Sequence, residues 1–238
     1  KSVQRRRGCN FLRSRLAVQV DLHVTNVGGV APLFKRIALT MLSFQAVTAI
    51  YLTFRYRQNY DDSWVDAAWQ GLFDAVMAFN NAGFSLNSDS LGRYSGDFAV
   101  IVPLGIVVFF GAVGFPVLAE LYSHWRQPST WSIHTRLTVF GSLGLAFLGT
   151  TAFLLLEWTN PGTIGEQPLP SRLLTAFEAG VMPRSGGFAS FDWTQVTGET
   201  QNLTSMLMFI GGGSASTAGG IKVTTFLLLA FVILAELR

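Results

Sequence analysis

Two segments of this chain share a twelve-residue pattern, and both lie between long apolar stretches. The first copy runs from Phe73 to Phe84 and the second from Phe177 to Phe188. Each opens with residues of helical character and ends on Gly-Phe. A short helix that ends in a glycine-containing loop between apolar segments is typical of a re-entrant loop, whose backbone contacts something at membrane depth. The repeat therefore predicts two such loops and, with them, an ion pathway.

The composition places the chain in a bilayer. Hydrophobic residues make up 50% of it and charged residues 13%, and the mean hydropathy is +0.38, which is too apolar for an ordinary soluble domain. A single cysteine, Cys9, excludes a disulfide framework, and three scattered histidines give no metal-site spacing. No nucleophile, base and metal set converges in the sequence, so we expect no catalytic residues, no enzyme activity and no cofactor.

Four apolar regions predict the transmembrane architecture. Ile37–Phe54, Phe98–Leu121 and Leu137–Leu156 are each long enough to cross a hydrocarbon core of roughly 30 Å. The fourth region, Leu203–Ala235, is interrupted by the glycine-rich run from Gly211 to Lys222. We therefore expect an all-α membrane protein whose last helix is broken in mid-membrane. Gly111–Pro116 in the second span predicts a kink with close helix contact.

The positions of basic residues predict the orientation. Eight of the seventeen Lys and Arg residues precede Ile37, which makes residues 1–36 a cytoplasmic basic linker. The two segments on the other side, 63–97 and 159–200, carry few basic residues and several acids, which would raise the local cation concentration. Because the chain begins at Lys1 and stops at Arg238 directly after an apolar run, we expect it to be a fragment of a longer protein.

Two short helices enter from the outer side. Ser63 and Asp66 form a capping box that begins a helix over Trp64–Phe79, and Pro170-Ser171 precedes a second helix over Arg172–Met182. Both would aim the partially negative ends of their helix dipoles into the membrane, which favours cations over anions.

The unit of span, pore helix, loop and span occurs twice in tandem. Lys35-Arg36-Ile37 and Thr135-Arg136-Leu137 occupy equivalent places before the first span of each unit. We predict one pore repeat over residues 37–125. A second repeat, with the broken final span, covers residues 126–238.

These motifs resemble the Trk/Ktr/HKT superfamily of potassium transporters, most closely its bacterial TrkH and KtrB members. The resemblance rests on Asn80-Asn81-Ala82-Gly83-Phe84, on Pro183-Arg184-Ser185-Gly186-Gly187-Phe188 and above all on the Ser-Thr-Ala-Gly-Gly-Ile-Lys string ending at Lys222. It covers nearly everything from about Leu33 onward. It implies a potassium-channel-like fold in which four such units surround one pore, of which this chain holds the second and third.

The resemblance also implies the chain's partners and place. Family members work as homodimers with a cytosolic nucleotide-binding regulatory subunit of the TrkA/KtrA kind, in the bacterial inner membrane. We expect a multi-pass plasma-membrane protein in contact with lipid, with potassium as its substrate and no nucleic-acid partner. A fragment with half of the filter is not expected to conduct alone.

The candidate filter residues flank two glycines. Backbone carbonyls near Gly83 and Gly187 can replace the hydration shell of potassium, because glycine permits the dihedral angles and the close approach that this requires. The alternative is that each Gly-Phe is a helix C-cap. We expect Phe84 and Phe188 to be packing wedges and Arg184 to point away and pair with Glu178. The predicted filter residues are Asn80, Asn81, Ala82, Gly83, Arg184, Ser185, Gly186 and Gly187.

The glycine-rich run predicts an intramembrane gate below the filter. It fails as a phosphate-binding loop because its lysine is not preceded by glycine in the required frame. Lys222 would be buried with a partner or a wet path, or would extend to the cytoplasmic interface. The predicted gate residues are Gly211, Gly212, Gly213, Ser214, Ser216, Thr217, Gly219, Gly220 and Lys222.

Two other functions stay open at the level of sequence. One is a sodium-permeable or sodium-coupled transporter of the same superfamily. The other is a structural membrane subunit whose broken helices serve packing and do not conduct. Measurement of potassium and sodium fluxes would distinguish the sodium-permeable transporter from a potassium transporter. Complementation of a potassium-uptake mutant would distinguish the structural subunit from a transporter.

Overall fold

The computed structural model describes residues 30–237. The chain divides into two parts, residues 1–43 and 44–238, and each is described by itself. The boundary falls inside α2 (Val30–Asn59). Most of the predicted basic linker, residues 1–36, lies outside the described residues. The second part holds all the predicted site residues.

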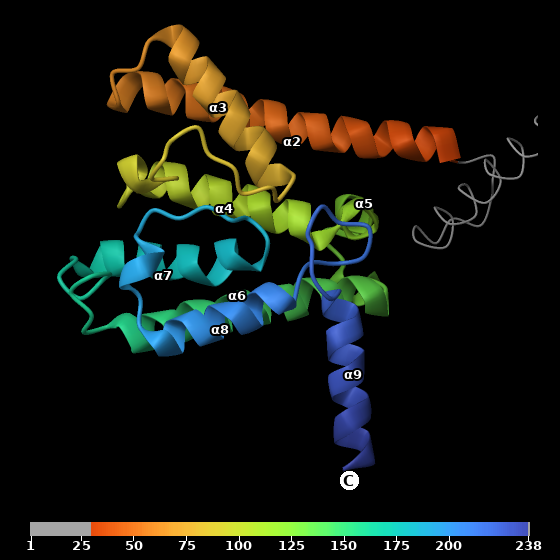
Figure 1. Ribbon diagram of the computed structural model, residues 1–238. Helices are drawn as coiled ribbons and strands as arrows, with labels where there is room; N and C mark the ends of the chain where they lie inside the picture. Colours follow the sequence, from red (N-terminus) through yellow and green to blue (C-terminus); the bar gives the residue numbers. More distant parts are fainter. Residues whose placement is uncertain (1–29, 238) are drawn as a thin grey trace, which may run out of the picture. The chain divides into compact units, whose positions relative to one another are not determined.

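Within the described residues the regular structure is helical, as predicted. In Figure 1, α6, α7 and α8 lie side by side, and α9 leads away from them after a loop at the end of α8. The helices after α2 are α3 (Trp64–Phe79), α4 (Phe98–Val113), α5 (Phe115–His124), α6 (Ile133–Glu157), α7 (Leu169–Val181), α8 (Gly198–Phe209) and α9 (Val223–Glu236). Short 3-10 turns lie at Gly92–Tyr94, Pro128–Thr130, Met182–Arg184 and Trp193–Gln195.

Two of the described helices are long and apolar enough to cross a membrane unbroken. They are Phe34–Asn59 within α2, and α6. The pair α4 and α5 reaches that length together but bends by 105° at Gly114. The kink predicted at Gly111–Pro116 is confirmed, although it breaks the predicted second span into two helices. The break predicted in the fourth apolar region is confirmed between α8 and α9.

The two short helices predicted between the spans are present. α3 has the predicted bounds, and its N-cap Ser63 accepts a hydrogen bond from the backbone N–H of Asp66 at 3.1 Å. α7 begins at Leu169, three residues before the predicted start. Pro170 fits the first turn, because an N–H group at this place has no acceptor within the helix and proline therefore loses no hydrogen bond.

A buried acid lies at the same place in each copy of the repeat. Asp74 on α3 accepts a hydrogen bond from the Tyr56 hydroxyl at 2.8 Å. Glu178 on α7 accepts from the Ser190 backbone N–H at 2.5 Å and also from the Ser190 hydroxyl. Both carboxylates are fully buried. They therefore fix each short helix to a neighbouring segment, Glu178 to the chain that leaves the second loop.

Charged groups tie the outer ends of the helices together. Arg55 donates to both carboxylate oxygens of Asp97, at 2.9–3.1 Å, and the Tyr60 hydroxyl donates to the same carboxylate at 2.6 Å. Arg93 donates to Asp62 at 2.8 Å, and this hydrogen bond raises the pKa of the Arg93 guanidinium. The segment that leads into α4 is thus anchored at two points, Arg93 and Asp97.

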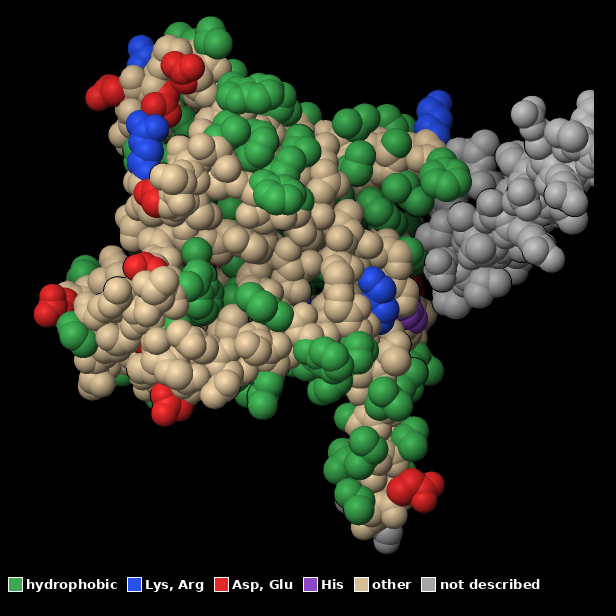
Figure 2. All heavy atoms as spheres, in the orientation of Figure 1, with side chains coloured by type: hydrophobic (Ala, Val, Ile, Leu, Met, Phe, Trp, Pro, Cys, Tyr) green, Lys and Arg blue, Asp and Glu red, His purple; other side chains and the backbone are tan. Residues whose placement is uncertain are grey.

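Several helices carry apolar side chains on their outer surfaces. Figure 2 shows hydrophobic side chains along α9, and the residues concerned are Leu228, Leu229, Phe231, Val232, Ile233 and Leu234. On α6 the side chains of Phe140, Phe147 and Leu155 are more than 60% exposed. Exposed apolar area of this extent on an α-helical chain fits contact with lipid.

The packing of α4 against the end of α3 depends on Gly111. A Cβ atom at this position would lie 2.1 Å from the Phe79 carbonyl oxygen, which is backbone and cannot rotate away. We expect Gly111→Ala to lower the free energy of unfolding by about 1–3 kcal/mol, the usual range for overpacking. The change is measured as thermal unfolding of the purified protein in detergent.

Gly144 is the matched control for this substitution. It lies within α6 with no atom within 4 Å of an added Cβ. Gly144→Ala should leave stability unchanged or raise it by about 0.5–1 kcal/mol, because alanine favours the helix. Equal unfolding temperatures for the two variants would show that α4 does not rest on the end of α3.

Candidate functional site

The first loop (Asn80–Gly83) and the second loop (Arg184–Gly187) meet at their glycines. A Cβ atom on Gly83 would lie 2.8 Å from the Cα of Gly187, and one on Gly187 would lie 2.7 Å from the Cα of Gly83. Both glycines have left-handed backbone, with φ of +70° and +69°. The contact therefore joins backbone to backbone and leaves no room for a side chain at either position.

The C-cap alternative does not account for Gly83. α3 ends at Phe79, and the residue after its C-cap, Asn81, already takes the left-handed conformation with φ +52°. Asparagine is the residue other than glycine that most often fills this place. Gly83 comes two residues later, where the chain contacts the other loop.

The second loop leaves its helix by a longer route. α7 ends at Val181 and continues into the 3-10 turn Met182–Arg184. The Gly187 N–H then donates to the Met182 carbonyl at 3.0 Å. In the first loop the Ala82 N–H donates in the same way to the carbonyl five residues before it, that of Met77, at 3.0 Å. Both loops thus turn back over the end of their own helix.

Arg184 does not pair with Glu178, so that prediction is wrong. The Arg184 guanidinium is buried and donates to the carbonyl oxygen of Ser142 on α6 at 2.9 Å and to that of Gly211 at 3.1 Å. Glu178 instead accepts from Ser190. Backbone carbonyls take the place of a carboxylate because the side chain of Arg184 reaches toward α6 and the start of the glycine-rich loop.

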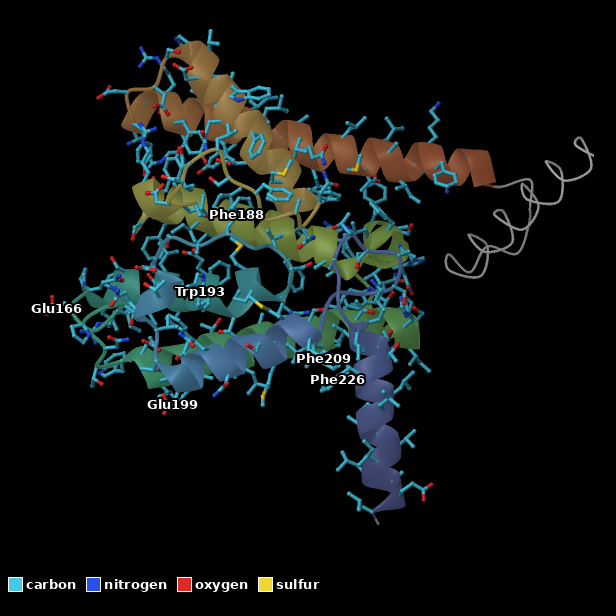
Figure 3. All side chains as sticks on the ribbon, viewed as in Figure 1. Glu166, Phe188, Trp193, Glu199, Phe209 and Phe226 are labelled. Carbon is cyan, nitrogen blue, oxygen red and sulfur yellow. The ribbon has the colours of Figure 1, made fainter. Side chains whose placement is uncertain are left out.

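The phenylalanines after the two glycines differ. Phe188 is 2% exposed and lies on the side of α7 that faces α4 (Figure 3), as expected of a packing wedge. Phe84 is 67% exposed, so the same prediction is wrong for Phe84 within the described chain.

The glycine-rich loop (Gly211–Lys222) lies between α8 and α9, next to Phe209 and Phe226 in Figure 3. Its two ends pair with each other, since the Gly211 N–H donates to the Ile221 carbonyl at 2.9 Å and the Ile221 N–H to the Phe209 carbonyl at 3.0 Å. Glu166 and Glu199 lie at the opposite end of α6 and α8 (Figure 3). The loop is therefore closed at its base and remote from these two acids.

The end of α4 supplies hydrogen-bond acceptors for this loop. The Gly213 N–H donates to the Ala112 carbonyl at 2.8 Å, and the Thr217 N–H donates to the Gly111 carbonyl at 3.3 Å. The last carbonyls of a helix have no intrahelical donor, and the bend at Gly114 leaves those of α4 free for the loop. The break in the second span is thus the surface on which the glycine-rich loop rests.

Three consecutive glycines allow this close packing. A Cβ atom on Gly211, Gly212 or Gly213 would lie 1.5–2.2 Å from a carbonyl oxygen, that of Gly219, Ala112 or Val113 respectively. The glycines therefore allow the loop backbone to lie directly against other backbone.

Lys222 begins α9. Its ammonium donates to the Ala218 carbonyl at 3.1 Å, and the residue is partly buried. Lys222 thus has a hydrogen-bond partner within the loop.

A small cavity lies behind the two loops. Its volume is about 10 Å³, close to the space of one water molecule, and its lining includes Asn81, Ser142, Arg184 and Ser185. Hydrogen bonds also join the predicted filter and gate residues, so both sets lie in one region, to which the end of α4 and the middle of α6 contribute. Sequence reasoning missed Ser142. It predicted a kink and a close helix contact at Gly111 but not the partner of that contact, which is the Phe79 carbonyl.

Comparisons with known proteins show what this chain is similar to. Relatives include the Ktr system potassium uptake protein B of Bacillus subtilis, 38% identical over 95% of this chain and 50% of the relative. The protein of the same name from Vibrio alginolyticus is 37% identical over 82% of this chain and 42% of the relative. The potassium/sodium uptake protein NtpJ of Enterococcus hirae is 30% identical over 89% and 46%. The chain thus spans about half the length of the curated relatives it matches.

A solved structure has the same fold. The potassium transporter TrkH from Vibrio parahaemolyticus superposes with a TM-score of 0.70 at 19% identity, over 94% of this chain and 45% of that one. A family model described as TrkH, cation transport protein, matches residues 4–238. The all-α membrane fold and the predicted resemblance are confirmed, and the chain belongs to the TrkH family of cation transport proteins, which are ion transporters and not enzymes.

Proposed function

We propose that this chain supplies two of the four loops of a potassium-selective pore and takes part in potassium uptake. The first and second loops are two adjacent corners of the filter, with backbone carbonyls near Gly83 and Gly187 as the potassium ligands. Residues 37–125 and 126–238 are the two pore repeats. The remaining corners come from sequence beyond those repeats, so the two loops do not form a conducting pore alone.

The observation that carries this proposal is the meeting of the two glycines. Repeats that are 104 residues apart place equivalent glycines in direct backbone contact, with φ of +70° and +69°. Repeats arranged around a common axis bring equivalent backbone positions together in this way. Behind each loop a helix C-terminus supplies partial negative charge, which favours a cation.

The glycine-rich loop serves as the gate in this proposal. It lies against both loops and rests on α4 through hydrogen bonds that can be broken and remade. Irregular backbone at membrane depth is tolerated where it contacts protein or a wet cavity, so both a resting and a displaced position are possible for it.

Location and partners follow from the family. We propose a multi-pass protein of the plasma membrane that forms a homodimer and binds a cytosolic nucleotide-binding regulatory subunit. A sodium-permeable variant of the same function is the second candidate, because one relative at 30% identity is named a potassium/sodium uptake protein.

Substitution of the first glycine tests the filter assignment. A serine at position 83 must adopt left-handed backbone at a cost of about 1–2 kcal/mol, and its Cβ would strike Gly187. We expect Gly83→Ser, made in the complete gene product, to lower the ratio of potassium to sodium flux about tenfold, the factor that corresponds to this cost. The ratio is measured in proteoliposomes.

Gly198→Ser is the control, because nothing lies within 4 Å of a Cβ on Gly198 and the substitution adds the same atoms. The control should keep the parent ratio. An unchanged ratio in Gly83→Ser at equal amounts of protein would remove Gly83 from the filter.

Complementation tests transport itself. We expect the complete gene product to restore growth of a potassium-uptake-deficient bacterium at low external potassium. Growth that stays at the level of the empty vector, with the protein present in the membrane, would favour the structural-subunit alternative.

A further inference from the structure

The glycine-rich loop is hydrogen-bonded to both predicted filter loops at three points. The Asn81 side-chain amide donates to the Thr217 hydroxyl at 2.8 Å. The Gly219 N–H donates to the Ser185 hydroxyl at 3.3 Å, and Arg184 donates to the Gly211 carbonyl at 3.1 Å. Asn81 and Thr217 are 136 positions apart in sequence. The contact therefore joins the first repeat to the break in the second.

Thr217 is the central point of this attachment. Its hydroxyl oxygen accepts from Asn81 and lies 2.9 Å from the Phe79 carbonyl oxygen and 3.0 Å from that of Gly111. The hydroxyl has one hydrogen, so it donates to one of these two carbonyls at a time. Both are C-terminal carbonyls, the first of α3 and the second of α4. One side chain thus connects the loop to two helix ends and to the first loop.

Asn81 can exchange partners without loss of all its hydrogen bonds. Its amide nitrogen also donates to the Phe79 carbonyl at 3.3 Å. When the glycine-rich loop moves away, that bond can remain while the bond to Thr217 is lost. On the Asn81 side, separation therefore costs one of two donated hydrogen bonds and leaves the amide nitrogen paired with the Phe79 carbonyl.

The Arg184 attachment differs because the guanidinium is held at two places. It donates to Ser142 on α6 as well as to Gly211, and it is buried. Gly211 directly follows Ile210, at the end of α8. Arg184 therefore anchors the base of the loop, while Thr217 holds its middle.

We propose that the hydrogen bond between Asn81 and Thr217 is a latch that couples the glycine-rich loop to the shape of the filter. Asn81 and Thr217 are positioning residues that bind no ion through their side chains. While the latch is closed, the loop stays below the filter, and the left-handed turn at Asn81 is held two residues before Gly83. When it opens, the loop is released and the first loop loses this support. The inference rests on the proposed function, in which these loops are filter and gate.

The test uses substitutions that remove the hydrogen bond between Asn81 and Thr217 without disturbing the backbone. Thr217→Val keeps the shape of the side chain and removes the hydroxyl, whereas Thr217→Ser keeps the hydroxyl. Asn81→Gly removes the amide and still permits left-handed backbone. Potassium and sodium fluxes of the complete gene product are measured in proteoliposomes and normalised to the amount of folded protein.

We expect Thr217→Val and Asn81→Gly each to raise potassium flux about fivefold, the factor that corresponds to one ordinary hydrogen bond, and to lower the ratio of potassium to sodium flux. Thr217→Ser should restore the parent behaviour. The double variant should show less than the product of the two single effects, because both substitutions remove the hydrogen bond between Asn81 and Thr217. Ser205→Ala removes an exposed hydroxyl bonded to the Gln201 carbonyl on α8, and it should change neither flux nor ratio.

Two results would overturn the latch. The first is unchanged flux and ratio in both Thr217→Val and Asn81→Gly, and the second is additive effects in the double variant. If the unsubstituted protein shows no potassium-selective flux, the proposed function itself fails, and this outcome is read from the parent before any variant is compared.

Discussion

Irregular backbone at membrane depth must find its hydrogen-bond partners within the protein, and this constraint organises the whole site. The chain leaves regular helix after α3, between α4 and α5, after α7 and between α8 and α9. These breaks satisfy one another. The end of α4 accepts from the glycine-rich loop, and Asn81 of the first loop and Ser185 of the second loop bond to the same loop. A break in any one helix is stable because the others supply its partners.

Glycine makes this mutual packing possible in two ways. At Gly83 and Gly187 it permits a left-handed turn together with contact between two backbones. At Gly211–Gly213 it permits carbonyl oxygens to approach where any side chain would collide. The glycine-rich loop therefore owes its composition to close contact.

Much of this could be predicted from the sequence, and the failures share a cause. The start of α3 followed from the Ser63 cap, and the equivalence of Gly83 and Gly187 followed from the repeat, because both signals are local or periodic. The partner of Arg184 did not follow. A nearby acid, Glu178, is the choice that charge alone favours, whereas the carbonyls of Ser142 and Gly211 become acceptors through tertiary packing. The bend at Gly114 was expected. The contact between this bend and the glycine-rich loop was not, because the residues of the bend carry no signal of their contact partner.

The most direct test of the account is to locate the permeating ion. Rubidium replaces potassium in filters of backbone carbonyls and can be located by anomalous scattering in crystals of the complete gene product. The account predicts rubidium peaks about 3 Å from carbonyl oxygens beside Gly83 and Gly187, on the axis that the two loops share. Rubidium bound elsewhere, with neither loop in contact with it, would contradict the claim that these glycines are adjacent corners of one filter.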